Sequence, residues 1–270
     1  MEHEVIARTT RSATVDSLVT ELRELGVQPG VVLLVHSSLS QLGWVAGGAQ
    51  AVVLALLEVV GPDGTVVMPT HSYVTDPASW HDPGVPEAWW PVIRQHLPAF
   101  DEVLTPTRGM GAIVECFRHT PGVRRSGHPS TSFAAHGRQS QAVVADHALD
   151  NDLGEGSPLA RVYDLDGQVL LLGVGHDNNT SLHLAEYRAV FPGRHWEGLG
   201  SPVLVDGVRH WVRYQHLAGD ASDFERIGGD FAADTGQERQ GPVGATRARL
   251  MGQRAVVDYA VAWMEHHRTV

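Results

Sequence analysis

One histidine stands where an enzyme built on a β-sheet would place a catalytic base. The chain has 16 histidines among 270 residues, so most of them must be surface or structural residues. His176 differs because a glycine-rich segment, 173–175, joins it to an apolar run at 168–172 that predicts a buried strand. Open α/β sheets bind their ligands at the carboxyl ends of the strands. We therefore interpret His176 as a candidate general base.

A carboxylate follows His176 at a spacing that could orient the imidazole. The residues after it predict a helix over 181–190, whose N-terminus would offer free N–H groups and a partial positive charge. Glu186 lies in this helix on the face of Leu182 and Ala189, so it could point inward. A buried carboxylate beside a histidine fixes its tautomer and raises its basicity. The alternative is that His176 only caps the helix and that Glu186 is solvated.

Two other segments carry hydroxyls or arginines that could bind anions. Residues 36–40 present three serines, counting Ser40, after the predicted strand 31–35, but they lack the glycines and lysine of a P-loop. Arg124 and Arg125 precede the hydroxyl-rich segment 128–133 and could hold phosphates. A pair of adjacent arginines is more often a solvated surface, so spacing alone does not separate these segments from ordinary loops.

The sequence offers little for metal or covalent catalysis. It has no HExxH motif, no paired cysteines and no G-x-S-x-G elbow. The single cysteine, Cys116, excludes an internal disulfide and is more typical of a buried thiol than of a nucleophile. The rival enzyme class is a metal-dependent amidohydrolase, and its ligands would be His128, His136, His176 and Asp177.

The net charge of the chain limits which kinds of ligand or macromolecule it is expected to bind. The formal net charge is −11, and all 20 basic residues are arginines, so a lysine nucleophile is excluded. An acidic surface argues against nucleic acid and anionic membranes and suits a cationic ligand, although acidity also serves solubility. The sequence has no apolar run long enough to span a membrane, and its first 20 residues lack the apolar centre of a signal peptide. We expect a cytoplasmic protein.

The first half of the chain predicts a parallel sheet. Apolar residues at helical spacing predict a helix over 15–25 that Thr14 caps. A buried strand at 31–35, a helix at 49–60 and a strand at 65–68 follow in order. This strand–helix–strand succession is typical of a crossover connection between parallel strands.

The remainder predicts a long loop, a hairpin and a final helix. Residues 69–106 are rich in Trp, His, Pro and Asp and lack periodicity, which indicates a functional loop with short helices. Asp206 and Gly207 separate two apolar runs and predict a hairpin turn. The last segment, 245–266, has helical spacing. One mixed α/β domain over residues 1–270 is the simplest organisation.

Several blocks of the chain, taken together and in order, resemble the antibiotic N-acetyltransferase family, typified by the aminoglycoside 3-N-acetyltransferases. They are 35–40 (VHSSLS), 68–70 (MPT), 107–112 (TRGMGA), 128–137 (HPSTSFAAHG), 154–159 (GEGSPL) and 167–186 (GQVLLLGVGHDNNTSLHLAE). The last block is long and highly specific. The resemblance implies the mixed α/β fold peculiar to these enzymes, with a C-terminal hairpin and helix.

The resemblance also implies an activity and a site. It implies transfer of the acetyl group of acetyl-coenzyme A to the 3-amino group of an aminoglycoside, without a metal, which confers resistance. By similarity His176 would be the base, Glu186 its partner, and the Thr180 hydroxyl or N–H groups at 37–39 the oxyanion donors. The residues expected to line the coenzyme site are Ser37, Ser38, Leu39, Thr70, Arg108, Gly109, Met110 and Gly111, with Thr70 near the thioester.

The acceptor is open to alternatives. Asp76, Glu155 and Asp177 lie in predicted loops and could bind a cationic aminoglycoside, although a loop carboxylate is by itself more often solvated. The Trp-rich segment 79–91 would also suit a smaller or more aromatic amine, so a different amine-bearing antibiotic or metabolite is one alternative. A non-catalytic acidic ligand-binding protein is another. Both a monomer and a homodimer are compatible with the sequence.

Overall fold

A mixed β-sheet forms the centre of the fold. The computed structural model describes residues 2–81 and 83–269, so Met1, Asp82 and Val270 lie outside the described residues. Within that part the main sheet has seven strands. In spatial order they are β3 (Arg124–Arg125), β4 (Phe133–Gly137), β2 (Thr65–Pro69), β1 (Val32–Ser37), β5 (Gln168–Leu172), β9 (Thr246–Gly252) and β8 (Arg239–Val243).

The three central strands run parallel and the outer ones antiparallel. β1 pairs in parallel with β2 and with β5, while β4 and β9 pair antiparallel on either side. Helix α3 (Gly48–Val60) connects β1 to β2, as the strand–helix–strand pattern predicted. The α/β class is confirmed, and the carboxyl ends of β1, β2 and β5 meet at one edge of the sheet.

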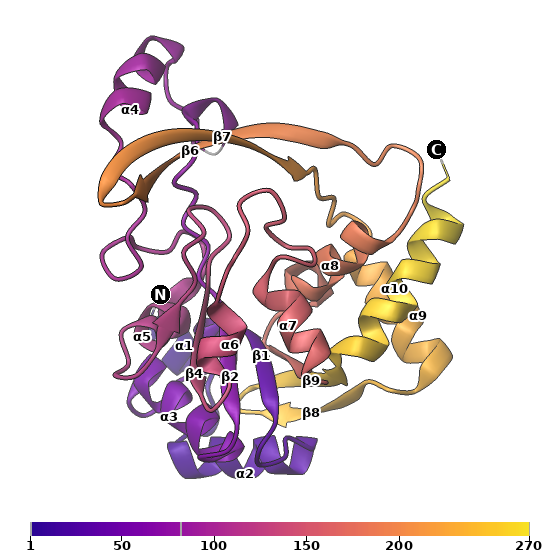
Figure 1. Ribbon diagram of the computed structural model, residues 1–270. Coiled ribbons are helices and arrows are strands. Elements are labelled where there is room, and N and C mark those ends of the chain that lie inside the picture. Colours follow the sequence, from indigo (N-terminus) through magenta and orange to yellow (C-terminus); the bar gives the residue numbers. More distant parts are fainter. Residues whose placement is uncertain (1, 82, 270) are drawn as a thin grey trace.

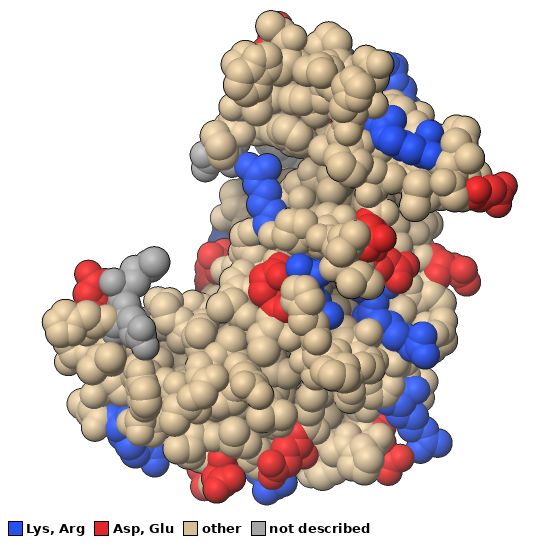
Figure 2. All heavy atoms as spheres, turned by 90° about the vertical axis from the view of Figure 1, so that its left-hand side faces the viewer, with Lys and Arg blue, Asp and Glu red and all other residues tan. Residues whose placement is uncertain are grey.

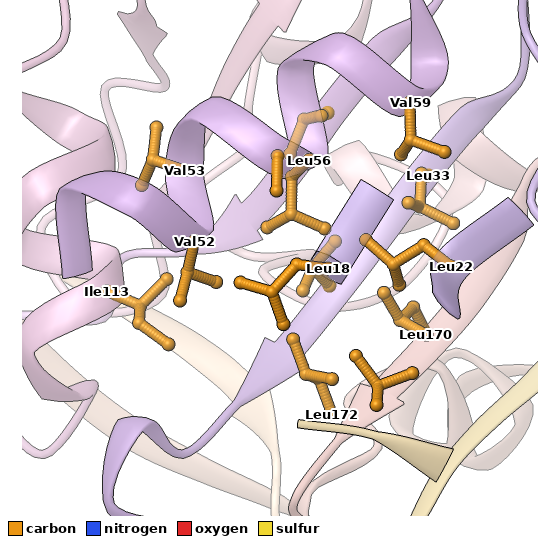
Figure 3. Packing of buried hydrophobic residues seen from close by; sticks show 14 of the residues in the cluster. Leu18, Leu22, Leu33, Val52, Val53, Leu56, Val59, Ile113, Leu170 and Leu172 are labelled. Carbon is orange, nitrogen blue, oxygen red and sulfur yellow. The ribbon is translucent and has the colours of Figure 1, made fainter. Parts of the chain in front are cut away.

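Helices α2 (Val15–Leu25), α3 and α5 (Gly111–Arg118) cover one face of the sheet. The α2 N-terminus is closed by a capping box in which the side chains of Thr14 and Ser17 each accept from the other's backbone N–H. Leu18 and Leu22 of α2 then pack with Leu56 of α3 over the strands (Figure 3). The predicted helix is therefore confirmed together with its cap.

The opposite face carries five helices. They are α6 (Ser140–Val144), α7 (Pro158–Asp164), α8 (Ser181–Arg188), α9 (Phe224–Thr235) and α10 (Gln253–His267). Leu182 and Ala185 of α8 are buried in the core on this face with Val257 and Met264 of α10. This packing fixes α8 at the end of β5, and Figure 1 shows α8 and α10 close together.

A two-stranded hairpin lies outside the main sheet. β6 (Trp196–Val205) and β7 (Val208–Leu217) pair antiparallel and turn at Asp206 and Gly207, both with positive φ, which confirms the predicted turn. The predicted long loop contains η2 (Pro77–Ser79), η3 (Glu87–Trp89) and α4 (Trp90–His96). In Figure 1 the hairpin arches across the top of the molecule beside α4. A short helix, α1 (Glu2–Arg8), precedes all these elements.

The prediction of a continuous helix over 245–266 is wrong at its beginning. Residues Thr246–Gly252 form β9, which pairs with both β5 and β8, and α10 begins only at Gln253. Ala248 and Leu250 are buried between the strands and the helices of the first face. The hydrogen bonds offered by the edge of β5 outweigh the helical spacing of these residues. In the described part of the chain, no helix is long and apolar enough to cross a membrane.

Candidate active site

A pocket opens at the carboxyl ends of the parallel strands. It has a volume of about 190 Å³ and is lined by the ends of β1 and β2, by the segment after β5, and by Gly109 and Met110. His36 and Ser37 come from β1, and His71 follows β2. Glycine at 109 has φ of +74°, a conformation that most side chains resist. Polar groups from separate strands therefore converge where an open sheet is expected to bind ligands.

A histidine–carboxylate pair faces this pocket from the first turns of α8. His183 Nδ1 donates to Glu186 Oε2 at 2.6 Å, and the two residues lie three positions apart on the helix. The His183 side chain is 22% exposed and lines the pocket, whereas that of Glu186 is 2% exposed. With Nδ1 bound to the carboxylate, Nε2 is the nitrogen that can accept a proton from a ligand.

Gly219 leaves the room that this pair needs. A Cβ at position 219 would lie 2.9 Å from His183 Nδ1 and 3.2 Å from Glu186 Oε2. The imidazole also packs edge-on against Phe224, with ring centroids 4.9 Å apart. The His183 ring is therefore held by an apolar ring on α9 as well as by its hydrogen bond.

His176 occupies a different environment from the one predicted. It begins the short 3-10 helix η4 (His176–Asn178), and its Nε2 donates to Glu238 Oε2 at 2.7 Å. Both side chains are 0% exposed, and His176 does not line the pocket. The predicted pairing of His176 with Glu186 is wrong, because Glu186 bonds to His183. The backbone turns His176 toward α9, where only a glycine at 228 leaves space for its ring.

Two more histidines adjoin the pocket and are held neutral. Burial, with smaller contributions from the neighbouring His183 and His176, lowers the pKa of His36 to about 3. Burial likewise lowers the pKa of His71 to about 3, with contributions from His183 and His36. His36 Nε2 lies 3.4 Å from the Thr180 hydroxyl oxygen. The pocket therefore gathers three imidazoles, of which His183 alone is bonded to a carboxylate among the described residues.

The pocket also contains polar atoms that lack partners within the described residues. Ser37 Oγ, His71 Nε2 and Asn179 Nδ2 are all buried and form no hydrogen bond there. All three residues line the same small pocket. Buried polar groups are almost always paired, so such a concentration indicates a site that completes its hydrogen bonds with a ligand.

Comparison with known proteins shows which family this chain belongs to. The model of the aminoglycoside 3-N-acetyltransferase family matches residues 34–265. The SPbeta prophage-derived aminoglycoside N(3')-acetyltransferase-like protein YokD of Bacillus subtilis is 43% identical over 96% of this chain and 95% of its own. The chain belongs to the aminoglycoside 3-N-acetyltransferase family. The crystal structure of YokD superposes with a TM-score of 0.95, at 42% identity, covering 98% of each chain.

Two other members of the family show the same similarity over nearly the whole chain. Aminoglycoside N(3)-acetyltransferase VII of Streptomyces paromomycinus is 37% identical over 97% of this chain and 94% of its own. A structure of AAC-IIIb as a binary complex with CoASH has a TM-score of 0.86, at 34% identity, covering 96% of this chain and 99% of that one. The resemblance drawn from the sequence blocks is confirmed.

The structure brings some of the predicted coenzyme-lining residues of this acetyltransferase together and separates others. Ser37, Gly109 and Met110 share the pocket, and the Arg108 N–H donates to the His71 carbonyl, which fixes this loop beside β2. Gly111 begins α5 directly after Met110.

Five predicted coenzyme-lining residues are not among those that line the pocket: Arg108 and Gly111, described above, and Ser38, Leu39 and Thr70. Ser38 donates its N–H to Leu172 O, and Leu39 begins the 3-10 helix η1 (Leu39–Leu42). Thr70 is fully buried, with its hydroxyl 3.1 Å from Ser132 Oγ and 3.2 Å from Arg125 Nε. Pro69, the last residue of β2, and His71 line the pocket, whereas Thr70 between them does not, so His71 takes the place where Thr70 was expected.

The predicted acceptor-binding acids lie in three separate places. Asp177 lines the small pocket beside His183. Asp76 lines a larger pocket of about 570 Å³ under the β6–β7 hairpin and accepts from Arg94 at 2.8 Å. Glu155 lies on the surface and pairs with Arg188. Among the described residues, no group of three or more His, Cys, Asp or Glu side chains is arranged so that it could hold a metal ion.

The buried histidines predict acid-sensitive stability. His36 and His71 bind protons below pH 6.5 when unfolded but only near pH 3 when folded, so the unfolded state gains more protons as the pH falls. Each one removes about 1 kcal/mol of stability between pH 6.5 and 5.5, where the unfolded imidazole is only becoming fully protonated, so this step should cost about 2 kcal/mol for the two together. Urea unfolding at these two pH values measures it.

A variant at His71 separates the contribution of this histidine from that of His36. His71→Asn keeps a polar side chain of similar size without a titrating ring, and it should remove about half of the contribution that His36 and His71 make together; burial also lowers the pKa of His128 and His147, whose contribution should remain. A free energy of unfolding that stays flat between pH 6.5 and 5.5 would show that these imidazoles are not held neutral.

Proposed function

We propose that this protein transfers the acetyl group of acetyl-coenzyme A to the 3-amino group of an aminoglycoside. The observation that carries the proposal is the His183–Glu186 pair, which opens into a pocket lined by unpartnered polar atoms. A base beside a set of unused hydrogen-bond groups suits acyl transfer, which needs one proton removed and one oxyanion stabilised. Family membership supplies the donor and the class of acceptor.

His183 is the general base in this proposal, in place of His176. A protonated amine has no free electron pair, so the acceptor ammonium first gives one proton to solvent; the neutral amine then attacks the thioester carbonyl carbon and must lose a second proton as the C–N bond forms. His183 Nε2 takes that proton while Glu186 stabilises the imidazolium through Nδ1. The tetrahedral adduct then collapses, the C–S bond breaks, and the departing thiolate receives the proton from His183. General-base assistance of this kind contributes about 10²–10⁴-fold.

The oxyanion needs donors that are already in position. Ser37, Asn179 and Thr180 line the pocket; Ser37 Oγ and Asn179 Nδ2 have no partner among the described residues, whereas the Thr180 hydroxyl lies 3.4 Å from His36 Nε2. The N–H of Ser38, predicted as a donor, is already bonded to Leu172 O. Removing one donor from an oxyanion site typically costs about 3–4 kcal/mol in the transition state. Asn179 is therefore the residue whose loss should resemble the loss of such a donor.

The two pockets divide the substrates between them. The small pocket beside Gly109 and Met110 takes the acetyl thioester, and the larger pocket under the hairpin takes the cationic acceptor. Asp76 and Glu197 line the larger pocket, and Asp177 lies at the smaller one. Residues of the segment 69–81 line both pockets, so one continuous stretch of the chain runs from one pocket to the other.

The distribution of charge bears on how the acceptor is recruited. Figure 2 shows acidic and basic side chains mixed across one face, which is hollowed below the upper projection. The net charge of −11 still favours encounter with a polycation over long range. Because no single-sign field covers this face, we assign acceptor specificity to individual carboxylates in the pockets.

Coenzyme A thiol release from acetyl-coenzyme A tests the proposal. We expect release with aminoglycosides that carry a free 3-amino group, no release with analogues blocked at that amine, and a product heavier by one acetyl group. Turnover confined to unrelated amines would keep the chemistry and overturn the acceptor. Tight binding of an aminoglycoside without turnover would favour the non-catalytic binding protein instead.

A further inference from the structure

The side chain that holds the Glu186 carboxylate comes from the far end of the chain. Arg268, directly after α10, donates from Nη1 to Glu186 Oε1 at 2.7 Å. We propose that Arg268 is a positioning residue for acetyl transfer, acting on His183 through Glu186. This inference rests on the proposed role of His183 as the base.

The two oxygens of Glu186 have separate partners. Oε1 accepts from Arg268 and from the backbone N–H of Asp220 at 2.9 Å, whereas Oε2 accepts only from His183 among the described residues. This division fixes the plane of the carboxylate and directs Oε2 at the imidazole. Burying a carboxylate that is 2% exposed is costly unless charged or polar partners surround it, and Arg268 is such a partner.

Arg268 is itself held in a fixed orientation. Its Nε and Nη2 donate to the two carboxylate oxygens of Asp223 at 2.8 and 2.6 Å, and Nη2 also donates to Asp220 O. The guanidinium lies over the Phe191 ring, 4.8 Å from its centroid. A planar guanidinium with fixed partners on both sides holds the Glu186 carboxylate in one orientation more firmly than the flexible ammonium of a lysine would.

The fold delivers this guanidinium to the site through one pair of helices. α10 packs against α8, and its buried residues Val257 and Met264 share a core with Leu182 of α8. The same helix pair therefore places Glu186 and the residue that follows α10 next to each other. Arg268 lies beyond residues 34–265, the stretch that the family model matches, so nothing in that match assigns it a role.

Substitution of Arg268 tests the proposal by kinetics. We expect Arg268→Gln to lower kcat by about 10–100-fold with KM for acetyl-coenzyme A nearly unchanged, because a small displacement of a catalytic group is that costly. Arg268→Lys keeps the positive charge but loses the planar set of guanidinium donors, so its kcat should lie between that of the wild type and that of Arg268→Gln. Arg254→Gln is the matched control, since it makes the same change on an exposed surface of α10. Wild-type kcat in Arg268→Gln would overturn the proposal.

A double variant separates a positioning role from general loss of structure. If Arg268 acts through Glu186, then Glu186→Gln/Arg268→Gln should be no slower than Glu186→Gln alone. Added guanidinium should also restore part of the kcat of Arg268→Ala and none of that of Glu186→Gln. If the losses of kcat in the two single variants multiply in the double variant, and guanidinium does not restore activity, Arg268 has a structural role only. A fully active His183→Ala would overturn the base and this inference together, whereas an inactive His183→Ala beside a fully active Arg268→Gln would overturn this inference alone.

Discussion

Replacing His183 with alanine should lower kcat for acetyl transfer by about 10²–10⁴-fold, the usual contribution of a general base. The ring is the one imidazole of the pocket that is bonded to a carboxylate among the described residues, and it lies on a well-packed helix. Its removal leaves the pocket wall formed by β1, β2 and Gly109 in place. Acetyl-coenzyme A affinity should therefore stay close to that of the wild type. Thiol release and calorimetric titration measure the two quantities.

The dependence of kcat/KM on pH is a second test of His183→Ala. The base-dependent rise of kcat/KM with pH should be present in the wild type and absent from His183→Ala, whose remaining activity should follow deprotonation of the acceptor amine in solution. His183→Gln, which keeps a hydrogen-bond donor toward Glu186, should be as slow as His183→Ala. A His183→Ala protein with wild-type kcat would show that another group removes the proton.

Replacing His176 should act on stability rather than on the chemical step. His176→Ala leaves the fully buried Glu238 side chain without the imidazole that bonds its Oε2, while Gln240 and Arg249 still contact Oε1. Burial raises the pKa of Glu238, but hydrogen bonds from His176 and Gln240 and the charge of Arg249 lower it overall. Removing one partner of such a pair costs about 3–5 kcal/mol. A fall in Tm of about 6–20 °C in a thermal unfolding experiment is expected.

Two companion variants show whether the loss of the imidazole from the Glu238 carboxylate is the cause. His176→Ala/Glu238→Gln removes the buried charge and should recover part of the lost Tm, since a neutral amide is less costly to bury with an incomplete set of partners. Gly228→Ala keeps both residues of the pair but places a Cβ 2.1 Å from His176 Cγ, so the ring must shift and Tm should also fall. Loss of activity in His176→Ala without any loss of stability would return His176 to the catalytic role that the sequence suggested.

The fold was predictable where local signals agreed with the tertiary structure. The Thr14 cap, the helical spacing after it and the Asp206–Gly207 turn each specify a structure within a few residues. The strand at Thr246–Gly252 was not predictable in the same way. Its residues have helical spacing, and only the free edge of β5, almost 80 positions earlier in the sequence, makes them a strand. Edge pairing of this kind leaves no local trace.

The site was predictable in its place and only partly in its residues. The rule that ligands bind at the carboxyl ends of strands led to the correct segment, because residues 177–180 line the pocket after β5. His183 and Glu186 were identifiable from their spacing of three residues on one helix face, a signal that the strand-end position of His176 obscured. Glu238 and Arg268 carried no such signal, since packing of α9 and α10 alone brings them to η4 and α8.

The most direct test of the central claim is a crystal structure of the protein with coenzyme A and an aminoglycoside. The account predicts that the coenzyme thiol lies in the pocket between Ser37 and Met110. It also predicts that the 3-amino nitrogen lies within about 3 Å of His183 Nε2, the reach of a hydrogen bond to a base. An acceptor amine that contacts some other base, or a thiol that enters away from this pocket, would contradict it.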